Sequence, residues 1–137
     1  MTTLNPYLSF RGDAAAAMAF YQSVFGGELT SMTFEQGGMP VDEAEKQLIM
    51  HSQLTTDGGL VLMGSDTPAH MEFSRGTDMT VSLSGTDEPE LQGYWNGLAE
   101  GATITYPLEK APWGDSFGQL TDRFGTRWMM NITAAAA

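Results

Sequence analysis

The sequence predicts an α+β fold made of two similar βαβββ modules. Apolar residues spaced three and four positions apart indicate an amphipathic helix near the start of the chain, and a second helix with the same spacing follows later. One strand-like run precedes each helix and three follow it, the last two joined by a hairpin turn. The element order therefore occurs twice, in about residues 3–65 and 77–133, and we expect residues 1–137 to form one domain from these two modules.

In the first module, the sequence predicts where the helix begins and where it ends. Asp13 is a candidate N-cap, and Gly26-Gly27 can end the helix because glycine readily takes the positive φ of a C-cap. The apolar stripe between them consists of Ala17, Phe20, Tyr21, Val24 and Phe25. Strands are expected over residues 4–10, 28–36, 47–56 and 60–64, with Asp57-Gly58-Gly59 as the turn between the last two.

The second module repeats this pattern. Asp87 and Glu90 form a variant of the capping box, and Gly101 ends the helix. Its strands are expected over residues 78–84, 102–106, 116–121 and 126–132, and Asp122 and Gly125 begin and close the last turn. The helical stripe consists of Leu91, Tyr94, Trp95 and Leu98. The spacing indicates an internal repeat, since 74 positions separate Asp13 from Asp87, Ala17 from Leu91, Tyr21 from Trp95, and Gly27 from Gly101.

The composition argues against several classes of protein. The net charge of -11 repels phosphate backbones and anionic lipid surfaces, so we expect neither a nucleic acid nor a membrane as a partner. Cysteine is absent, which excludes disulfides and thiolate chemistry and fits a cytoplasmic location. No apolar run approaches the roughly 20 residues of a membrane span, and the first ten residues do not read as a signal peptide.

Short sequence phrases spread over nearly the whole chain carry a family resemblance. They are Asn5-Pro6-Tyr7-Leu8-Ser9-Phe10, Ala19-Phe20-Tyr21, Phe25-Gly26-Gly27, Ile49-Met50-His51, Leu62-Met63-Gly64-Ser65-Asp66, Phe117-Gly118-Gln119-Leu120-Thr121-Asp122-Arg123-Phe124-Gly125 and Trp128-Met129-Met130-Asn131. With the repeated βαβββ order, they resemble the vicinal-oxygen-chelate superfamily of glyoxalases, bleomycin-resistance proteins and dioxygenases, and within it the PhnB-like branch. The resemblance implies that the two curved sheets pair to form a cup, and that the protein is a homodimer.

The resemblance also implies where a metal would bind in a superfamily enzyme. Its ligands come from the first, fourth, fifth and eighth strands, which correspond here to Asn5, Leu62, Thr80 and Met129. Divalent metals in such sites favour carboxylate or imidazole ligands, and none is present at these positions. We therefore expect no metal and no cofactor. The methyltransferase label of the PhnB-like branch is not supported either, because no Gly-rich turn of a nucleotide-binding βαβ unit is visible.

Alternation along the strands places five candidate ligand-binding residues on the face expected to line the cup: Tyr7, His51, Gln53, Arg127 and Asn131. Trp113 and Phe117 are further candidates at the mouth of the cup, although aromatic residues at strand spacing are more often part of a core. Aromatic rings can stack on a flat ligand, and arginine can hold an anionic group. Histidine exchanges a proton near neutral pH, so His51 is the candidate acid or base, although a histidine hydrogen-bonded on a polar sheet face fits the pattern equally well. Asp66 and Asp115 are expected to be solvated loop carboxylates.

Three functions remain open from the sequence. The first, which we favour, is a metal-free protein that binds a small apolar or aromatic molecule in the cup. The second is a lyase- or dioxygenase-type enzyme that uses the same cup, with His51 as acid or base or with a metal on unusual ligands. The third is an interaction module whose cup is vestigial. The expected partners are a small-molecule ligand and a second copy of the chain, since sheet edges are usually paired or covered.

Overall fold

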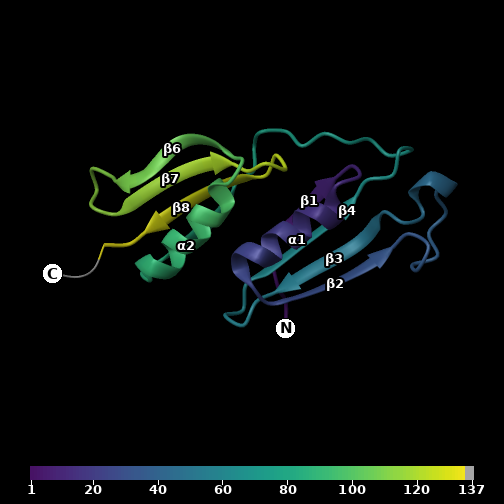
Figure 1. Ribbon diagram of the computed structural model, residues 1–137, viewed down its shortest axis with the longest axis horizontal. Coiled ribbons are helices and arrows are strands. Elements are labelled where there is room, and N and C mark those ends of the chain that lie inside the picture. Colours follow the sequence, from purple (N-terminus) through teal and green to yellow (C-terminus); the bar gives the residue numbers. More distant parts are fainter. Residues whose placement is uncertain (135–137) are drawn as a thin grey trace. The chain divides into compact units, whose positions relative to one another are not determined.

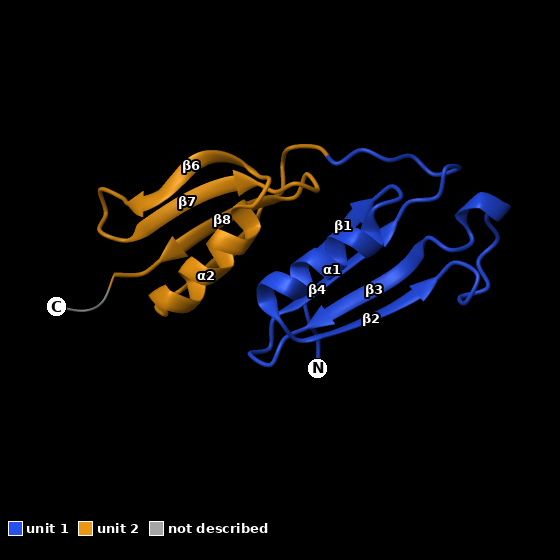
Figure 2. Ribbon diagram, in the orientation of Figure 1, with its two compact units in different colours: residues 1–75 blue, residues 76–137 orange. Residues whose placement is uncertain are grey.

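The computed structural model describes residues 1–134 and confirms the two predicted βαβββ modules (Figure 1). The chain divides into two compact units, Met1–Arg75 and Gly76–Ala137, each of which contains one module (Figure 2). We describe each unit by itself.

In the first unit, helix α1 packs against one face of a four-stranded sheet (Figure 1). The strand order is β1-β4-β3-β2, with β1 parallel to β4 and the other neighbours antiparallel. The elements are β1 (Tyr7–Phe10), α1 (Ala14–Phe25), β2 (Glu28–Thr33), β3 (Ile49–Thr55) and β4 (Val61–Asp66), and the loop before β3 contains a single 3₁₀ turn, η1 (Glu43–Glu45).

The second unit has the same arrangement, with α2 packed against a sheet of order β5-β8-β7-β6. Its parallel pair is β5 and β8, and the other neighbours are antiparallel. The elements are β5 (Val81–Gly85), α2 (Glu88–Ala99), β6 (Thr103–Lys110), β7 (Ser116–Thr121) and β8 (Arg127–Ile132). Strand β6 continues four residues beyond the predicted end at Tyr106, and this extension forms part of the candidate site described below.

The two helices begin with different caps. Asp87 accepts a hydrogen bond from the Glu90 backbone N–H at 3.2 Å, as the capping pattern predicts. At α1, however, the side chain of Asp13 makes no capping hydrogen bond. Asp66, at the end of β4, takes this role: its Oδ1 accepts from the Gly12 and Ala14 N–H groups at 2.7 and 3.0 Å.

Asp66 is a structural carboxylate, so its assignment as a solvated loop residue is wrong. It is only 3% exposed, and its Oδ2 accepts a third backbone hydrogen bond, from Ile49 at 2.9 Å. The parallel pairing of β1 with β4 brings the end of β4 next to the start of α1, where free N–H groups and the helix dipole favour a negative charge. Asp66 therefore connects β3, β4 and α1.

The two cores consist of the buried part of each helix and the sheet residues beneath it. Phe20, Val24 and Phe25 of the predicted α1 stripe are only half-buried. In α1 the buried residues are Ala14, Ala17, Met18 and Tyr21, and in α2 they are Leu91, Trp95 and Leu98. Gly118 on β7 lies directly below Trp95, where an added Cβ would come within 2.8 Å of the Trp95 ring. A glycine in this strand therefore permits the close approach of helix and sheet.

The last two strands of each module form a hairpin, and the two hairpins have similar turns. Thr56 pairs with Leu60 in the first hairpin and Asp122 with Thr126 in the second, through N–H to carbonyl bonds of 2.9 and 2.8 Å. The Asp122 carboxylate, which is 4% exposed, also accepts from the backbone of Phe124 and Thr126 and from the Trp128 indole N–H at 2.9 Å. The turn is therefore anchored to the core of the second unit.

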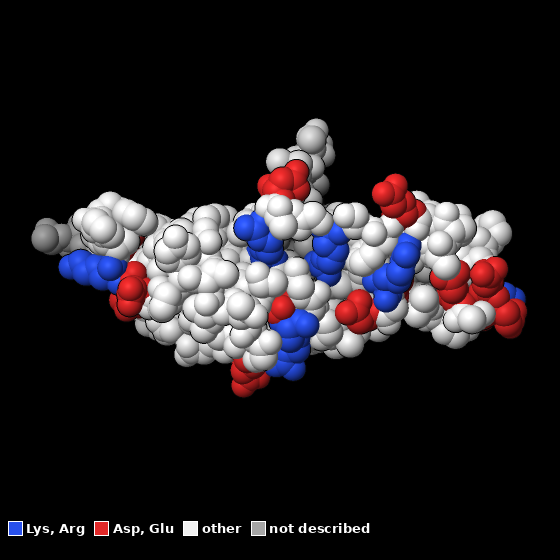
Figure 3. All heavy atoms as spheres, turned by 90° about the horizontal axis from the view of Figure 1, so that it is seen from above, with Lys and Arg blue, Asp and Glu red and all other residues white. Residues whose placement is uncertain are grey.

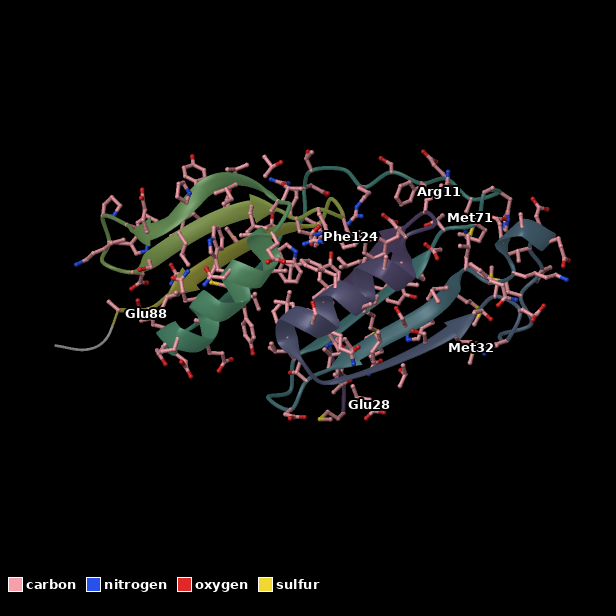
Figure 4. All side chains as sticks on the ribbon, viewed as in Figure 1. Arg11, Glu28, Met32, Met71, Glu88 and Phe124 are labelled. Carbon is pink, nitrogen blue, oxygen red and sulfur yellow. The ribbon has the colours of Figure 1, made fainter. Side chains whose placement is uncertain are left out.

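The segment after β4 is held against β1 by two arginines. The guanidinium of Arg11 donates to the carbonyl oxygens of Pro68 and Met71 and lies 5.1 Å from the centroid of the Phe73 ring. Figure 4 shows the Arg11 side chain beside the segment that carries Met71. Arg75 lies 4.9 Å from the centroid of the Phe10 ring. The guanidinium groups of both arginines therefore make contacts within the first unit.

Candidate functional site

The sheet face opposite each helix carries most of the predicted binding residues. In β4, burial alternates so that Leu62, Gly64 and Asp66 face α1, whereas Met63 and Ser65 face the other way. The placement of Leu62 at a family metal-ligand position is therefore wrong, because Leu62 is a core residue. Met63, on the opposite face, lies beside Tyr7 in the strand register.

In the first unit, Tyr7 and His51 form a hydrogen-bonded pair on this face. The Tyr7 hydroxyl oxygen lies 3.1 Å from His51 Nδ1, and the ring centroids are 5.6 Å apart with planes inclined by 32°. Strand β4 lies between the two strands that carry them, so the tyrosine side chain reaches across it. The sequence could not reveal this pair, because 44 positions separate its members.

Gln53 lies on the same face as this pair. It is next to Met63 in the register of β3 and β4, and its side-chain amide donates to the Thr55 hydroxyl at 3.2 Å. Met50, next to His51 in β3, lies where the register of β2 and β3 shifts, and it is half-buried. Three predicted residues, Tyr7, His51 and Gln53, thus share one polar sheet surface.

In the second unit, three aromatic rings form a groove between β6, β7 and the loop that joins them. The Phe117 ring is flanked by Trp113 and Tyr106, with centroids 5.8 and 6.4 Å away and planes inclined by 63° and 60°. Trp113 and Tyr106 remain 62% and 61% exposed. The groove has a volume of about 460 Å³, and its other lining residues are Pro107, Glu109, Lys110, Ala111, Pro112 and Gln119. We call it the aromatic groove.

Tyr106 is a functional candidate that the sequence did not predict. Its strand is predicted but the pairing of the strand is not, and β6 shifts register against β7 on both sides of Tyr106. Such irregularities re-aim side chains at the edges of sheets. The only signal in the sequence was an aromatic residue next to Pro107, a residue typical of an edge strand.

Asn131 lies opposite Phe117 in the register of β7 and β8 and holds the carboxylate of Asp115. Its side-chain amide donates to Asp115 Oδ2 at 3.0 Å, and the Ala134 N–H donates to Oδ1 at 3.0 Å. The hydrogen bond from Asn131, and then the one from Ala134, lower the pKa of Asp115 below its usual value of 3.8. Asp115 is therefore a hydrogen-bonded residue rather than a freely solvated one.

Arg127 is separated from the aromatic groove. It begins β8, at the opposite end from Asn131, and its guanidinium donates to the carbonyl oxygen of Thr77. Arg123 binds the end of α2, where its Nε donates to the Glu100 carbonyl oxygen at 3.1 Å and its Nη2 lies 3.6 Å from the Glu100 carboxylate. The structure thus brings Trp113, Phe117 and Asn131 close together, but not Arg127.

The charged side chains of residues 1–134 form no cluster of three or more His, Cys, Asp or Glu able to hold a metal ion. On the face in Figure 3, acidic and basic side chains are scattered among uncharged ones. In the same residues, no helix is both long and apolar enough to span a membrane. The absence of a metal stays a prediction of the sequence.

Comparison with known proteins identifies the family. The model of the Glyoxalase/Bleomycin resistance protein/Dioxygenase superfamily matches residues 3–130. Protein YjdN of Escherichia coli is 30% identical over 142 residues, covering 94% of each chain. The crystal structure of PA1353 from Pseudomonas aeruginosa is 34% identical, with a TM-score of 0.83 over 96% of this chain and 98% of that one.

A second solved structure shares the fold at lower identity. It is the PhnB protein from Bacillus cereus, described as a putative 3-demethylubiquinone-9 3-methyltransferase, with 24% identity and a TM-score of 0.75 over 96% of this chain and 100% of that one. Family match, sequence relatives and fold agree with the resemblance seen in the sequence. The chain belongs to the Glyoxalase/Bleomycin resistance protein/Dioxygenase superfamily.

Proposed function

We propose that the protein binds a small, flat, apolar or aromatic molecule, and that the ring of this ligand lies in the aromatic groove. One observation carries the proposal: two largely exposed rings, Trp113 and Tyr106, flank the ring of Phe117. Removing large aromatic side chains from water is energetically favourable, and a ligand that covers the two exposed rings removes them from water. The groove volume of about 460 Å³ also lies within the range of roughly 300–1,000 Å³ usual for small-molecule sites.

The shape and rim of the groove restrict the ligand. Because the outer rings are inclined by about 60° to Phe117, a flat ligand that stacks on one ring presents its edge to another. Gln119, Glu109 and Lys110 supply polar atoms at the lining, which is otherwise apolar. Few polar groups around an apolar surface are typical of sites that orient a small molecule.

Substitution of Trp113 tests this proposal. We expect Trp113→Ala to weaken the binding of planar probes such as acetylnaphthalene by about 1–3 kcal/mol, the usual contribution of one aromatic stacking contact. Ile104→Ala is the matched control, because Ile104 is an exposed apolar residue of β6 that does not line the groove. Isothermal titration calorimetry gives the affinities. Equal affinities for wild type and Trp113→Ala would contradict the proposal.

Catalysis is the second candidate function, because His51 lies on an accessible sheet face and histidine is the most frequent general acid or base. The Tyr7 hydrogen bond fixes the orientation of the ring, and a base role at Nδ1 requires this bond to open. If His51 has this role, His51→Ala should lower the rate by on the order of 10²–10⁴-fold. In a protein that only binds, the same substitution should leave affinity for an apolar ligand nearly unchanged. Mass spectrometry of co-purifying molecules would supply the compound for both assays.

The proposal includes neither a metal nor a cofactor. With Met63 in place of Leu62, the family ligand positions offer Asn5, Met63, Thr80 and Met129, and thioethers are poor ligands for hard divalent ions. We also propose a homodimer, since each four-stranded sheet has two edge strands that need cover. We propose a cytoplasmic location because the chain has no cysteine. That the Tyr7 face and the aromatic groove line one cup stays a prediction of the sequence.

A further inference from the structure

We propose that Tyr7 holds the neutral imidazole of His51 in the tautomer that carries hydrogen on Nε2, so that His51 offers an N–H donor to an oxygen acceptor of a small molecule bound on this sheet face of the first unit. The acceptor class would be a carbonyl or a similar oxygen attached to an apolar body. The choice of ligand rests on the proposed binding function, whereas the tautomer can be measured without any ligand.

The contact between the two side chains is anchored by the sheet. Tyr7 is fixed by the parallel pairing of β1 with β4, and His51 by the pairing of β3 with β2 and β4. The oxygen-to-nitrogen distance of 3.1 Å is that of a normal hydrogen bond, and the rings lie side by side at 5.6 Å. Since Tyr7 is 48% exposed, burial does not force its hydroxyl toward His51.

The direction of this hydrogen bond follows from the chemistry of its two groups. In a neutral imidazole one ring nitrogen donates and the other accepts, whereas a phenol hydroxyl can do both. A phenol O–H is a better donor than an imidazole N–H, and the bare ring nitrogen is a better acceptor than a phenol oxygen. The favoured arrangement is therefore Tyr7 O–H donating to Nδ1, and this choice places the imidazole hydrogen on Nε2.

The surroundings of His51 support a donor role. In the register of β2 and β3, His51 lies opposite Met32, an apolar side chain that is 43% exposed. Ser65 of β4 lies on the same face of the sheet. The ion pairs of Lys46 with Glu43 and of Arg123 with Glu100 do not involve His51, and the hydrogen bond described for its ring is the one with Tyr7. An N–H beside an apolar contact suits a ligand oxygen at the end of a hydrophobic molecule.

This tautomer also affects the enzyme hypothesis. With hydrogen on Nε2 and Nδ1 occupied by Tyr7, neutral His51 has no ring nitrogen free to remove a proton from a ligand. It can stabilise negative charge on a ligand oxygen, as donors in oxyanion sites do. A base role would require the Tyr7 contact to break.

Nitrogen NMR of the intact protein tests the tautomer. With ¹⁵N-labelled histidine at alkaline pH, where imidazoles are neutral, His51 should show a bare-nitrogen shift at Nδ1 and an N–H shift at Nε2. Exposed His70 serves as the internal reference. Tyr7→Phe should lower the Nε2–H to Nδ1–H ratio of His51 by roughly fivefold, toward that of His70, as expected for loss of one hydrogen bond. Tyr94→Phe, which removes a hydroxyl from α2, should change nothing.

Two results would overturn the tautomer assignment. One is hydrogen on Nδ1 of His51 in the wild type, and the other is an unchanged His51 spectrum in Tyr7→Phe.

A matched pair of probes tests the ligand class. Acetylnaphthalene, which has a carbonyl acceptor, should shift the His51 Nε2 signal and bind several-fold more weakly to Tyr7→Phe than to wild type. Ethylnaphthalene lacks the acceptor and should bind both proteins equally. Equal responses to the two probes would overturn the donor role. Failure of both probes to bind would contradict the binding function as well, while the ligand-free spectra would still decide the tautomer.

Discussion

Loss of the Asp66 carboxylate should destabilise the first unit strongly. Asp66→Ala removes the acceptor of three backbone N–H groups, those of Gly12, Ala14 and Ile49, at a site that is 3% exposed. A buried donor left without an acceptor costs about 1–3 kcal/mol, so three of them, partly relieved by water, should cost about 3–6 kcal/mol. This loss is a large part of the free energy of unfolding of a typical domain, which is about 5–15 kcal/mol.

Two further variants separate the hydrogen bonds from general effects of the substitution. Asp66→Asn keeps an oxygen for Gly12 and Ala14 but turns an amide N–H₂ toward Ile49, so we expect a loss of only about 1–3 kcal/mol. Asp57→Ala is the control, because Asp57 is an exposed carboxylate in a turn, and its loss should change stability by less than about 0.5 kcal/mol.

Urea unfolding followed by far-UV circular dichroism measures these differences. The chain's three tryptophans, Trp95, Trp113 and Trp128, all lie in the second unit, so their fluorescence reports separately on that unit. An Asp66→Ala protein within about 0.5 kcal/mol of wild type would refute the reasoning, because that range is usual for surface substitutions. So would equal losses for the Ala and Asn variants.

Three further predictions concern charge, metal and assembly. Asn131→Ala should raise the pKa of Asp115 toward 3.8 in a carboxyl NMR titration. Because the pKa of Asp115 is lowered in the folded state, its stabilising contribution is present above the unfolded-state pKa and is lost as the pH falls through the folded-state pKa. Identical titrations of wild type and Asn131→Ala would contradict the role of Asn131. Elemental analysis of protein purified without an affinity tag should find no stoichiometric transition metal, and one metal per chain would favour the enzyme instead. Light scattering should give twice the monomer mass of 14.8 kDa at micromolar concentration, and a monomer mass throughout would exclude the homodimer.

The sequence by itself determined the elements and their order. Leu91, Trp95 and Leu98 of the α2 stripe are buried as their spacing predicts, and the turns at Gly59 and Gly125 have the positive φ that their glycines permit. These features depend on residues a few positions apart, so one sequence contains all the information that they need. The family, too, could be identified from local phrases, because these phrases occur in most of the elements.

Only the tertiary structure decided which distant residues meet. The register of β1 against β4 places Asp66 at the start of α1 and Tyr7 beside β4, within reach of His51, and the irregular pairing of β6 with β7 positions Tyr106 next to Phe117. A shift of one residue reverses the face on which a strand residue lies, which is why Leu62 was assigned to the wrong face. Register depends on packing between segments far apart in the chain, and no local pattern in a single sequence specifies it.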